Sequence, residues 1–361
     1  MKTNKQFVYE RNHISTMKRL RIKESRDLIN GIRMNRNERV DDFEKNIFSK
    51  IFSKTKSYNL SKYPDHSNLY SKLKIFLKVD EKNFILTSGI DGSLKSIFEI
   101  FLKKGDSIGC LLPSYAMYEV FSKIYNIKLL KISYDKDNYR LNRKELFSSI
   151  SKVKILFIPN PNQPIEDNLS LSELEKICKI CEKNKTLLVI DEAYHMFGSN
   201  TAASLIKKFK NLLVLRTFSK AFGVPSIRLG YAIGPENLIS ILNTYRLSYE
   251  TNFLSEEVIQ YFLKNLGAVK KYINNVKNGR DYFKSELNKL GISSFGKNSN
   301  FVLIKLNNKN MANKLYEFLL KKKIYVKGKY PGFLSDCLLL TCAKKNTMMK
   351  IISQIKIFLK K

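Results

Sequence analysis

The chain has no tryptophan and only three histidines and five cysteines among its 361 residues. His13, His66 and His195 are too few and too scattered for a metal site, so no metal is expected. Cys178 and Cys181 form a Cys-x-x-Cys pair, but no second cysteine pair or histidine cluster completes a zinc site. We expect both thiols to be reduced, half-buried residues of an amphipathic helix in a cytoplasmic protein.

Long apolar runs and acidic residues are also scarce. No apolar run approaches the roughly 18 residues of a membrane helix, and the N-terminal sequence lacks the apolar core of a signal peptide. Lysine and arginine number 65 against 32 aspartates and glutamates, which gives a net charge of +33. The lysines are spread along the chain and belong to no recognisable binding module. We therefore expect no membrane partner and no specific nucleic-acid partner, but a field that attracts anionic substrates.

The chain does contain enough apolar sequence, 43% of its residues, to bury a large core and a smaller second one. Strand-like runs alternate with helix-like stretches up to about residue 235, which predicts an α/β domain with a mostly parallel seven-stranded sheet. A helical pattern follows to about residue 290, and the remaining strands and helices predict a smaller α+β C-terminal domain. The strand-like runs are residues 84–87, 108–112, 128–132, 154–158, 187–191, 212–216 and 229–233, and the clearest helix-like stretches are residues 93–101, 116–125 and 171–183.

The segment Arg-Thr-Phe-Ser-Lys-Ala-Phe-Gly-Val-Pro-Ser-Ile-Arg, residues 216–228, joins two of these strand-like runs. A lysine between two strands, with a hydroxyl one residue before it and an arginine eight after it, fits a Schiff base to pyridoxal 5′-phosphate. Lys220 is the candidate amine, Ser219 the candidate phosphate donor and Arg228 a fixed positive charge at the same phosphate. An ordinary surface turn with one lysine among many is the alternative.

Two other strand-like runs end in candidate ring contacts. Ligands of open α/β sheets bind at the carboxyl ends of the strands, which is where Asp191 lies. Its carboxylate would pair with the pyridine nitrogen and keep the ring an effective electron sink, and Tyr194 would reach the ring hydroxyl. The segment after Ile158 is rich in proline and asparagine, which predicts a rigid turn that presents an amide to the cofactor.

Together, these segments resemble the fold-type-I pyridoxal-phosphate enzymes, and within that group histidinol-phosphate aminotransferase and its relatives. The resemblance runs from about Met34 to the end of the chain. It implies a cytoplasmic class I/II aminotransferase that works as a homodimer with shared active sites. It also implies an N-terminal arm, residues 1–50, that contributes to the small domain and the dimer, a large PLP-binding domain of residues 51–245 and a small domain of residues 246–361.

Further segments acquire a role only through this resemblance. Tyr63, in Lys-Tyr-Pro-Asp, resembles the tyrosine that reaches the phosphate in the partner subunit's site, and Tyr115 the tyrosine that stacks on the pyridine ring. Residues 89–93 resemble the turn and helix start that hold the phosphate, where free backbone N–H groups bind anions. The implied catalytic residues are Lys220, Asp191 and Tyr115. The implied cofactor-binding residues are Gly89, Ile90, Asp91, Gly92, Ser93, Tyr115, Asn162, Gln163, Asp191, Tyr194, Ser219, Lys220, Arg228 and Tyr63.

The sequence departs from the family pattern where the substrate is expected. The family's Pro-Asn-Asn-Pro-Thr-Gly is replaced by Pro-Asn-Gln-Pro-Ile-Glu, residues 161–166. The resemblance then implies that Gln163 would face the ring hydroxyl, with Asn162 beside it. Leu339 occupies the position of the family's arginine that pairs with the substrate carboxylate. Neither an apolar residue nor a lysine can copy the bidentate contact that an arginine makes there. Lys327 keeps a charge at a second basic position. The candidate substrate residues are therefore Arg36, Arg39, Lys327 and Leu339, with Lys329 and Lys344 as further cations.

Several functions remain open at this point. The first is an aminotransferase that acts on a small phosphorylated or phosphonate amine or carbonyl compound. A decarboxylase of a phosphorylated amino acid and a conventional amino-acid aminotransferase with a relocated carboxylate site are alternatives, as is an inactive protein. A non-enzymatic regulator of this fold would need a DNA-binding module, for which residues 1–30 are too short. A nucleic-acid-binding protein would retain its affinity at physiological salt.

Overall fold

The computed structural model of the protein describes residue 17, residues 30–53 and residues 55–360. The predictions for the N-terminal residues 1–16 and 18–29, including His13 and the first part of the proposed arm, lie outside the described residues.

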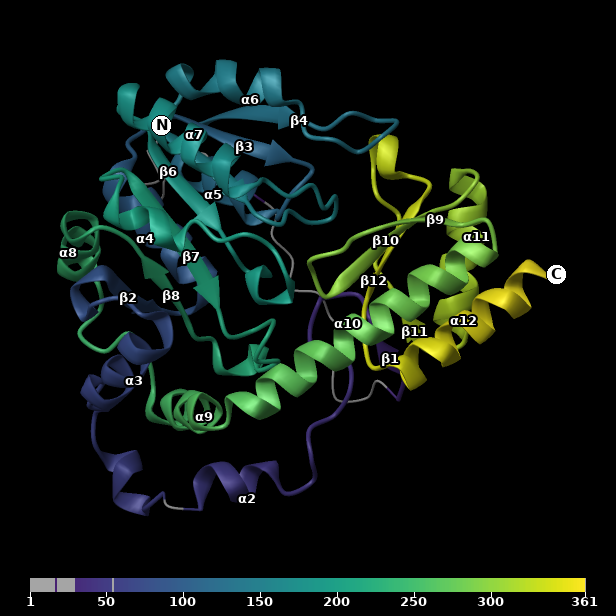
Figure 1. Cartoon of the computed structure of the whole chain (residues 1–361), viewed down its shortest axis with the longest axis horizontal. Coiled ribbons are helices and arrows are strands. Elements are labelled where there is room, and N and C mark those ends of the chain that lie inside the picture. The colour runs from purple at the N-terminus through teal and green to yellow at the C-terminus, as the bar shows by residue number, and fades with distance from the viewer. Residues whose placement is uncertain (1–16, 18–29, 54, 361) are drawn as a thin grey trace, which may run out of the picture.

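A seven-stranded sheet forms the centre of the larger part of the molecule (Figure 1). The strand order is β2-β8-β7-β6-β5-β3-β4, and only β8 runs antiparallel to its neighbours. This mostly parallel sheet confirms the sequence prediction. The strands are β2 (Phe84–Thr87), β3 (Ser107–Leu112), β4 (Lys128–Ser133), β5 (Ile155–Pro159), β6 (Leu187–Asp191), β7 (Leu212–Thr217) and β8 (Gly230–Ile233).

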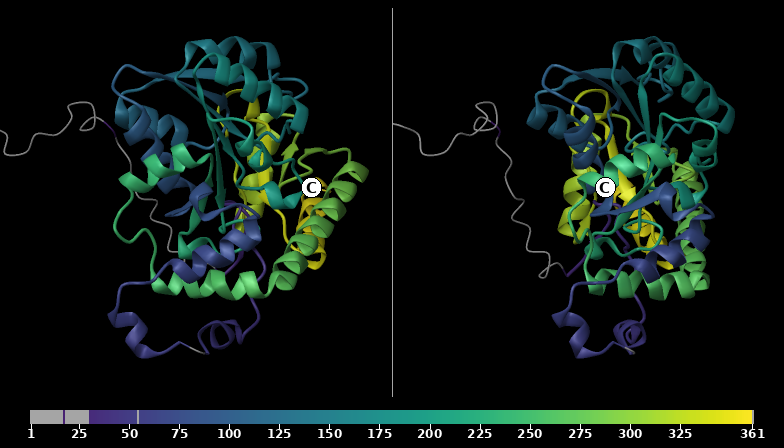
Figure 2. Two further views of the ribbon diagram at one scale, coloured as in Figure 1. Left: turned by 60° about the vertical axis from the view of Figure 1, so that its left-hand side comes forward. Right: turned by 90° about the vertical axis from the view of Figure 1, so that its left-hand side faces the viewer.

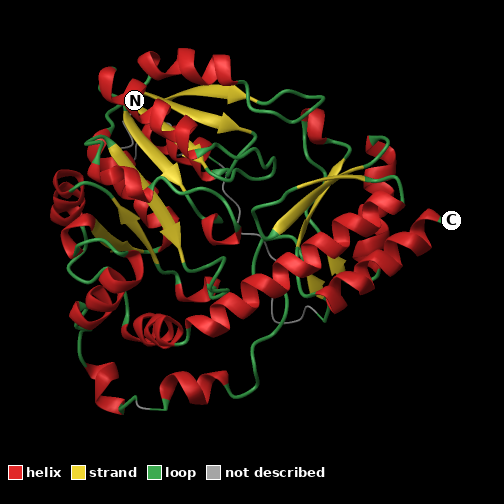
Figure 3. Ribbon diagram, in the orientation of Figure 1, coloured by secondary structure: helices red, strands yellow, loops and turns green. Residues whose placement is uncertain are grey.

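The central strands are buried along almost their whole length, and β7 becomes polar only at its last two residues, because both faces of the sheet are covered (Figure 3). Successive residues point to opposite faces, so Leu188 and Ile190 join one hydrophobic cluster and Val189 joins the other. Helices α4 (Gly89–Phe101), α5 (Met117–Tyr125) and α8 (Glu236–Tyr245) contribute to the second cluster. Helices α3 (Ser67–Leu77), α6 (Arg143–Ser149) and α7 (Leu171–Lys183) contribute to the first.

Helix α7 begins where the sequence predicts, because Ser170 and Glu173 form a capping box. The Ser170 hydroxyl accepts from the Glu173 amide, and the Glu173 carboxylate accepts from the Ser170 amide. Cys178 and Cys181 lie on the face of α7 that packs against the sheet. They are fully buried free thiols, so the expectation that they are half-buried was wrong.

A smaller, three-stranded antiparallel sheet lies beside the large one, in the order β12 (Cys337–Thr341), β10 (Phe301–Lys305), β9 (Ser293–Phe295). The long helix α10 (Leu266–Lys289) contacts this sheet and α12 (Lys345–Leu359), and α11 (Lys309–Lys321) lies beside them. Helix α9 (Phe253–Lys264) leads into α10 along the lower side of the molecule (Figure 1).

The N-terminal segment joins both parts of the molecule. Strand β1 (Ile32–Arg33) pairs in parallel with β11 (Ile324–Tyr325), and the carbonyl of Met34 accepts from the Thr341 amide of β12. The chain then passes to α2 (Ile47–Phe52), which contacts α9 at the edge of the molecule (Figure 2). Residues 34–38 therefore lie between the small sheet and the loops of the large one.

Candidate active site

A cavity of about 860 Å³ lies at the carboxyl ends of β3, β5, β6 and β7. The strand order reverses between β3 and β5, and such a reversal is where open α/β sheets bind ligands. The N-terminal segment and the residues after β11 close the other side. Its lining includes Asn35, Arg36, Glu38, Ile90, Asp91, Ser114, Tyr115, Gln163, Asp191, Tyr194, Thr217, Ser219, Lys220, Arg228, Tyr316, Lys327 and Gly328.

Lys220 lies on the tight turn that follows β7. Gly223, with a φ of +70°, closes this turn, and its amide donates to the Lys220 carbonyl. The Lys220 Nζ donates to the carbonyl oxygens of Asn37 at 3.0 Å and Arg36 at 3.3 Å. Withdrawal from water lowers the pKa of Lys220 to about 8. Near neutral pH this amine therefore has a much larger uncharged, nucleophilic fraction than a surface lysine.

Asp191 is the last residue of β6 and is only 6% exposed. Its carboxylate accepts from the Tyr118 hydroxyl at 2.8 Å and from the Ala193 amide at 3.0 Å. Burial raises the pKa of Asp191 to about 6, although both hydrogen bonds oppose that change. A protonated ring nitrogen in the cavity would supply the cation that this buried carboxylate needs.

Gln163, Tyr194 and Asn37 form a hydrogen-bonded group at another wall of the cavity. The Tyr194 hydroxyl donates to Gln163 Oε1 at 2.9 Å, and the Asn37 Nδ2 donates to both that oxygen and the Tyr194 hydroxyl. Burial raises the pKa of Tyr194, so its hydroxyl stays protonated near neutral pH. The structure therefore brings the two residues predicted for a ring hydroxyl together.

Asn162 does not line the cavity. It is fully buried, its Nδ2 donates to the carbonyls of Pro113 and Ile165, and its Oδ1 accepts from the Ser114 hydroxyl at 2.6 Å. These bonds use its amide to hold the loop after β5 against the loop after β3. Of the two neighbouring amides, only Gln163 is placed to meet a ligand.

The predicted phosphate contacts gather where α4 begins. Gly89 has a φ of +67°, and a Cβ atom on it would lie 3.0 Å from Arg228 Nη2, so glycine lets the arginine approach the helix start. Arg228 Nη2 also lies 3.7 Å from Asp91 Oδ2. Ser219 Oγ, which accepts from the Thr217 hydroxyl, lines the same cavity. The free amides at the start of this helix, those of residues 89–91, add the partial positive charge that binds anions.

The predicted aromatic contacts lie in different places. Tyr115 lines the cavity, is 38% exposed and donates from its hydroxyl to Asp91 Oδ1 at 2.8 Å. Tyr63 is 77% exposed, lies outside the cavity lining of its own chain and stacks on Tyr249, with ring centroids 4.1 Å apart.

The candidate substrate residues are only partly brought together. Arg36 and Lys327 line the cavity, whereas Leu339 is fully buried and Arg39 lies away from the cavity. The Arg39 guanidinium carbon lies 3.8 Å from the centroid of the Phe43 ring and 4.3 Å from that of Tyr272, because this group packs between the two rings. The structure therefore does not support Arg39 as a direct substrate contact.

Lys327 and Leu339 are backbone neighbours. The Lys327 amide donates to the Leu339 carbonyl at 3.0 Å, and the Lys327 carbonyl accepts in return from the Leu339 amide at 2.8 Å. Surrounding protein atoms lower the pKa of Lys327, and its Nζ lies 5.5 Å from the centroid of the Tyr330 ring. Lys329 instead pairs with Glu317 at 2.7 Å, and Lys344 lies 3.9 Å from Asp41. Among these lysines, only Lys327 lines the cavity.

A sequence model of the family described as aminotransferase class I and II matches residues 34–355. The chain belongs to the class I and II aminotransferases. Histidinol-phosphate aminotransferase of Caldanaerobacter subterraneus subsp. tengcongensis is 33% identical over 301 residues, which cover 82% of this chain and 84% of that protein. These findings confirm the family prediction and identify the chain as a PLP-dependent transaminase.

Solved structures confirm the fold. The histidinol-phosphate aminotransferase from Sinorhizobium meliloti, in complex with pyridoxal-5′-phosphate, superposes with a TM-score of 0.86 at 18% identity over 97% of each chain. The L-threonine-O-3-phosphate decarboxylase from Porphyromonas gingivalis has a TM-score of 0.76 at 19% identity, over 91% of this chain and 100% of that one. The aminotransferase therefore has the fold-type-I architecture that the sequence predicts. Among the described residues, none of the helices combines the length and apolarity of a bilayer span.

The residues around the cavity fit the cofactor of this family, pyridoxal 5′-phosphate. Lys220 offers an amine with a lowered pKa, and Asp191 offers a buried carboxylate that accepts two hydrogen bonds and forms no direct ion pair within the described part of the chain. The start of α4 and Arg228 offer donors to a phosphate. Sequence reasoning missed Tyr118 and Asn37 because the partners that give them a role are far away in the chain, 73 residues for Tyr118 and 126 to 183 residues for Asn37.

Proposed function

We propose that this aminotransferase acts on a small compound that carries a phosphate or phosphonate beside a primary amine or the matching carbonyl. Lys327 carries the proposal, because it lines the cavity beside the backbone of Leu339 and has no ion-pair partner among the described residues. Arg36 lines the same cavity. The relatives named histidinol-phosphate aminotransferase support a phosphorylated substrate by analogy.

We propose these roles for the residues around the cofactor. When bound, PLP supplies an electron sink for the electrons of a bond to the substrate carbon. Lys220 Nζ holds the cofactor and moves the proton at that carbon, Asp191 keeps the ring nitrogen charged, and Tyr115 covers the ring. Gln163 and Tyr194 hold the ring hydroxyl. Ser219, Arg228 and the free amides at the start of the 89–93 turn hold the phosphate.

The apolar residue at position 339 restricts the substrate. A carboxylate brought into this site without a partner would cost several kcal/mol, and a lysine gives one point charge where an arginine gives a planar fork. Common α-amino acids should therefore bind weakly unless Lys327 or Arg36 takes the carboxylate. That second case corresponds to a conventional amino-acid aminotransferase with a relocated carboxylate site.

Decarboxylation of a phosphorylated amino acid is the second candidate reaction. The same cofactor chemistry serves both reactions, and the bond that is broken depends on how the substrate lies over the ring. The L-threonine-O-3-phosphate decarboxylase from Porphyromonas gingivalis shares the fold, which supports the candidate at the level of architecture alone.

A spectroscopic screen of the purified enzyme distinguishes these functions. We expect phosphorylated amines to convert the cofactor band to its amine form, and glutamate and alanine to do so slowly. Release of carbon dioxide with the original band restored would indicate decarboxylation. Rapid conversion by glutamate or alanine, with no response to phosphorylated amines, would show that the proposal of an altered anion site is wrong. Leu339→Arg should then be tested for a gain in amino-acid turnover, with Lys327→Ala as its companion.

We also propose a cytoplasmic homodimer with shared active sites. Large apolar side chains are exposed on the segments around α2 and on those between α8 and α9, including Phe48, Leu60, Tyr63 and Leu247, which are 71%, 68%, 77% and 77% exposed. Apolar side chains gathered in this way are typical of a surface that another protein covers. Within each chain we propose an arm of residues 1–50, a large domain of residues 51–245 and a small domain of residues 246–361.

A further inference from the structure

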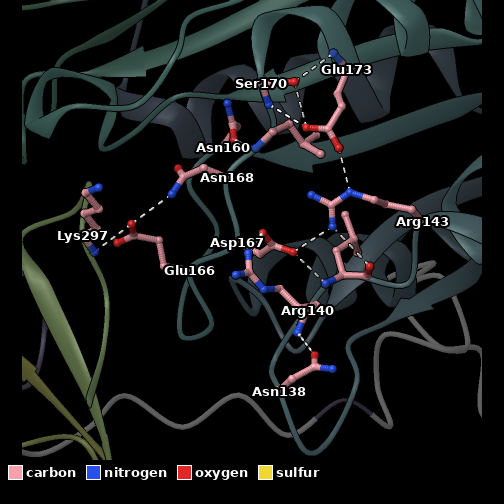
Figure 4. Close-up of polar contacts among 12 residues, drawn as sticks. Asn138, Arg140, Arg143, Asn160, Glu166, Asp167, Asn168, Ser170, Glu173 and Lys297 are labelled. Carbon is pink, nitrogen blue, oxygen red and sulfur yellow. Dashed lines mark hydrogen bonds and ion pairs between the residues drawn. The ribbon is translucent and has the colours of Figure 1, made fainter. Parts of the chain in front are cut away.

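Glu166 stands in the loop after β5, at the position where the family resemblance expects glycine. Its side chain reaches from this loop to the loop between β9 and β10 (Figure 4). Glu166 Oε1 accepts from the amides of Lys297 at 2.9 Å and Asn298 at 2.6 Å, and Oε2 accepts from the Ser299 hydroxyl at 2.5 Å. One carboxylate thus joins the large sheet to the small one.

The loop of residues 296–300 is held from its other side by α10. Lys284 Nζ donates to the Gly296 carbonyl at 2.7 Å, and Arg280 Nη1 donates to the Ser299 carbonyl at 3.0 Å. Gly296 has a φ of +118°, and a Cβ atom on it would lie 2.8 Å from the Phe301 carbonyl oxygen. The shape of the loop is therefore fixed within the smaller part of the molecule, and Glu166 ties that shape to the large sheet.

The far end of this loop leads to the catalytic lysine. Asn300 directly follows the Ser299 that Glu166 binds, and its Nδ2 donates to the Asn37 carbonyl at 3.1 Å. The same carbonyl oxygen accepts from Lys220 Nζ at 3.0 Å. Asn37 is only 1% exposed, and its side chain contacts Gln163 and Tyr194, so a shift of Asn300 would be transmitted into the cavity.

We propose that Glu166 is a positioning residue that latches the 296–300 loop to the large sheet and so holds Asn300 and the Asn37 carbonyl against Lys220. The inference rests on Lys220 being the reactive amine of the proposed function, but on no particular substrate. The competing explanation is local, because a carboxylate that accepts from two amides also stabilises the loop that it caps. If Glu166 only stabilises the loop, its removal leaves Lys220 unchanged. If Glu166 is a positioning residue, its removal also changes the surroundings of Lys220.

Two measurements on the apoprotein separate these explanations. Hydrogen exchange followed by mass spectrometry reports the amides of residues 296–300. The pH dependence of Lys220 modification by an amine-reactive reagent, followed by mass spectrometry on the peptide that contains Lys220, reports the lysine. Asp167→Asn is the matched control, because Asp167 is a buried carboxylate of the same loop whose partners, the Leu141 amide and Arg143, belong to the large-sheet part (Figure 4).

We expect Glu166→Ala to speed exchange at residues 296–300 at least tenfold and to raise the midpoint pH of Lys220 modification, because a loosened site lets water reach the ammonium. Glu166→Gln keeps an acceptor oxygen and should restore both values most of the way, whereas Asp167→Asn should change neither. Glu166→Gly, which carries the family residue, provides a second variant if alanine impairs folding.

Unchanged exchange in both Glu166→Ala and Glu166→Gly would overturn the latch. Faster exchange with an unchanged Lys220 midpoint, or the same two changes in Asp167→Asn, would overturn the positioning role. Neither measurement uses a substrate. A failed substrate screen would therefore count against the proposed function alone, and a failed midpoint shift against the Glu166 inference alone.

Discussion

Asp191 is buried and Lys220 is partly buried beside the cavity, and withdrawal from water moves their pKa values toward each other, to about 8 for the lysine and about 6 for the acid. Burial disfavours the charged form of each group, so it lowers the pKa of the amine and raises that of the acid. The two groups need different protonation states for their roles. The lysine needs to lose its proton in order to attack, whereas the acid needs to stay ionised in order to hold a cation.

The first prediction concerns Lys220. Because its pKa is lowered to about 8, formation of a borohydride-reducible adduct between apoprotein and PLP should accelerate as the pH rises through about 8. An ordinary lysine would require a pH near about 10.4. Lys220→Ala should form no adduct at this site and should lose at least about 10²-fold to 10⁴-fold in turnover. Lys327→Ala is the control and should keep the adduct; an adduct that persists in Lys220→Ala would mean that the lysine is misassigned.

A second prediction concerns the hydrogen bond from Tyr118 to Asp191. This bond stabilises the carboxylate and opposes the rise that burial causes in its pKa. Tyr118→Phe should therefore raise the pKa of Asp191 further above about 6. Affinity of the apoprotein for PLP, titrated by fluorescence, should fall as the pH drops through this pKa, and the fall should begin at a higher pH in the variant. Identical pH profiles for the two proteins would show that Tyr118 does not tune the acid.

At the scale of elements, local patterns predicted the positions of strands well. The apolar runs at β2 and β6 and the helix α7 have the predicted bounds, because each is bounded by turn residues or a cap. Helix α4 starts at Gly89, four residues before the predicted start at Ser93, because glycines and a polar turn disguise its first turn. The two-residue strands β1 and β11 have no periodicity of their own and form only through tertiary pairing.

The residues of the candidate site also fall into those that the sequence could predict and those that it could not. The structure places four predicted residues around one cavity, and each lies near the end of a strand with a recognisable segment around it: Lys220, Asp191, Tyr194 and Arg228. Asn37 and Asn300 could not be found, because their roles come from backbone carbonyls and side chains that only the folded chain brings together. Arg39 was misplaced because sequence spacing cannot show that its guanidinium packs between two rings.

The third prediction concerns the contact between α4 and Arg228. Gly89→Ala places a Cβ atom 3.0 Å from Arg228 Nη2 and in a backbone region that costs L-residues about 1–2 kcal/mol. We expect a lower melting temperature and a weaker affinity for PLP, measured by thermal unfolding and by fluorescence titration. Gly267→Ala on α10 is the control, since its added Cβ would meet no described atom within 4 Å outside its own stretch of the chain, and it should leave PLP affinity unchanged. Equal affinities in Gly89→Ala and the parent would show that the helix start does not hold the phosphate.

At the scale of the whole molecule, the two sheets and the N-terminal segment meet around one cavity, yet Tyr63 is not part of its lining. Its 77% exposed ring stacks on Tyr249, near further exposed apolar side chains. Apolar groups that are this exposed on a single chain are typical of a surface that another protein copy buries. In a twofold dimer the same surface of each chain meets its counterpart, so a residue lent to the partner is received in return.

This reciprocity yields the last prediction. Lys220→Ala and Tyr63→Ala should each reduce turnover strongly as separate homodimers, the first through the lost amine and the second through a weakened phosphate site. After the two are mixed and subunits exchange, each hybrid dimer should contain one site with both lesions and one site with neither. Turnover should then recover toward about a quarter of the parent value under random exchange.

Light scattering should give a dimer for all three preparations at micromolar concentration, which makes the mixing interpretable. Ile357→Ala replaces Tyr63→Ala in the control mixture, because Ile357 is 42% exposed but lies on α12. That variant should be active by itself, so its mixture should show only the average of its components. If the Tyr63→Ala mixture also gives no more than the average of its two components, Tyr63 acts within its own chain or not at all, and the sites are not shared through it.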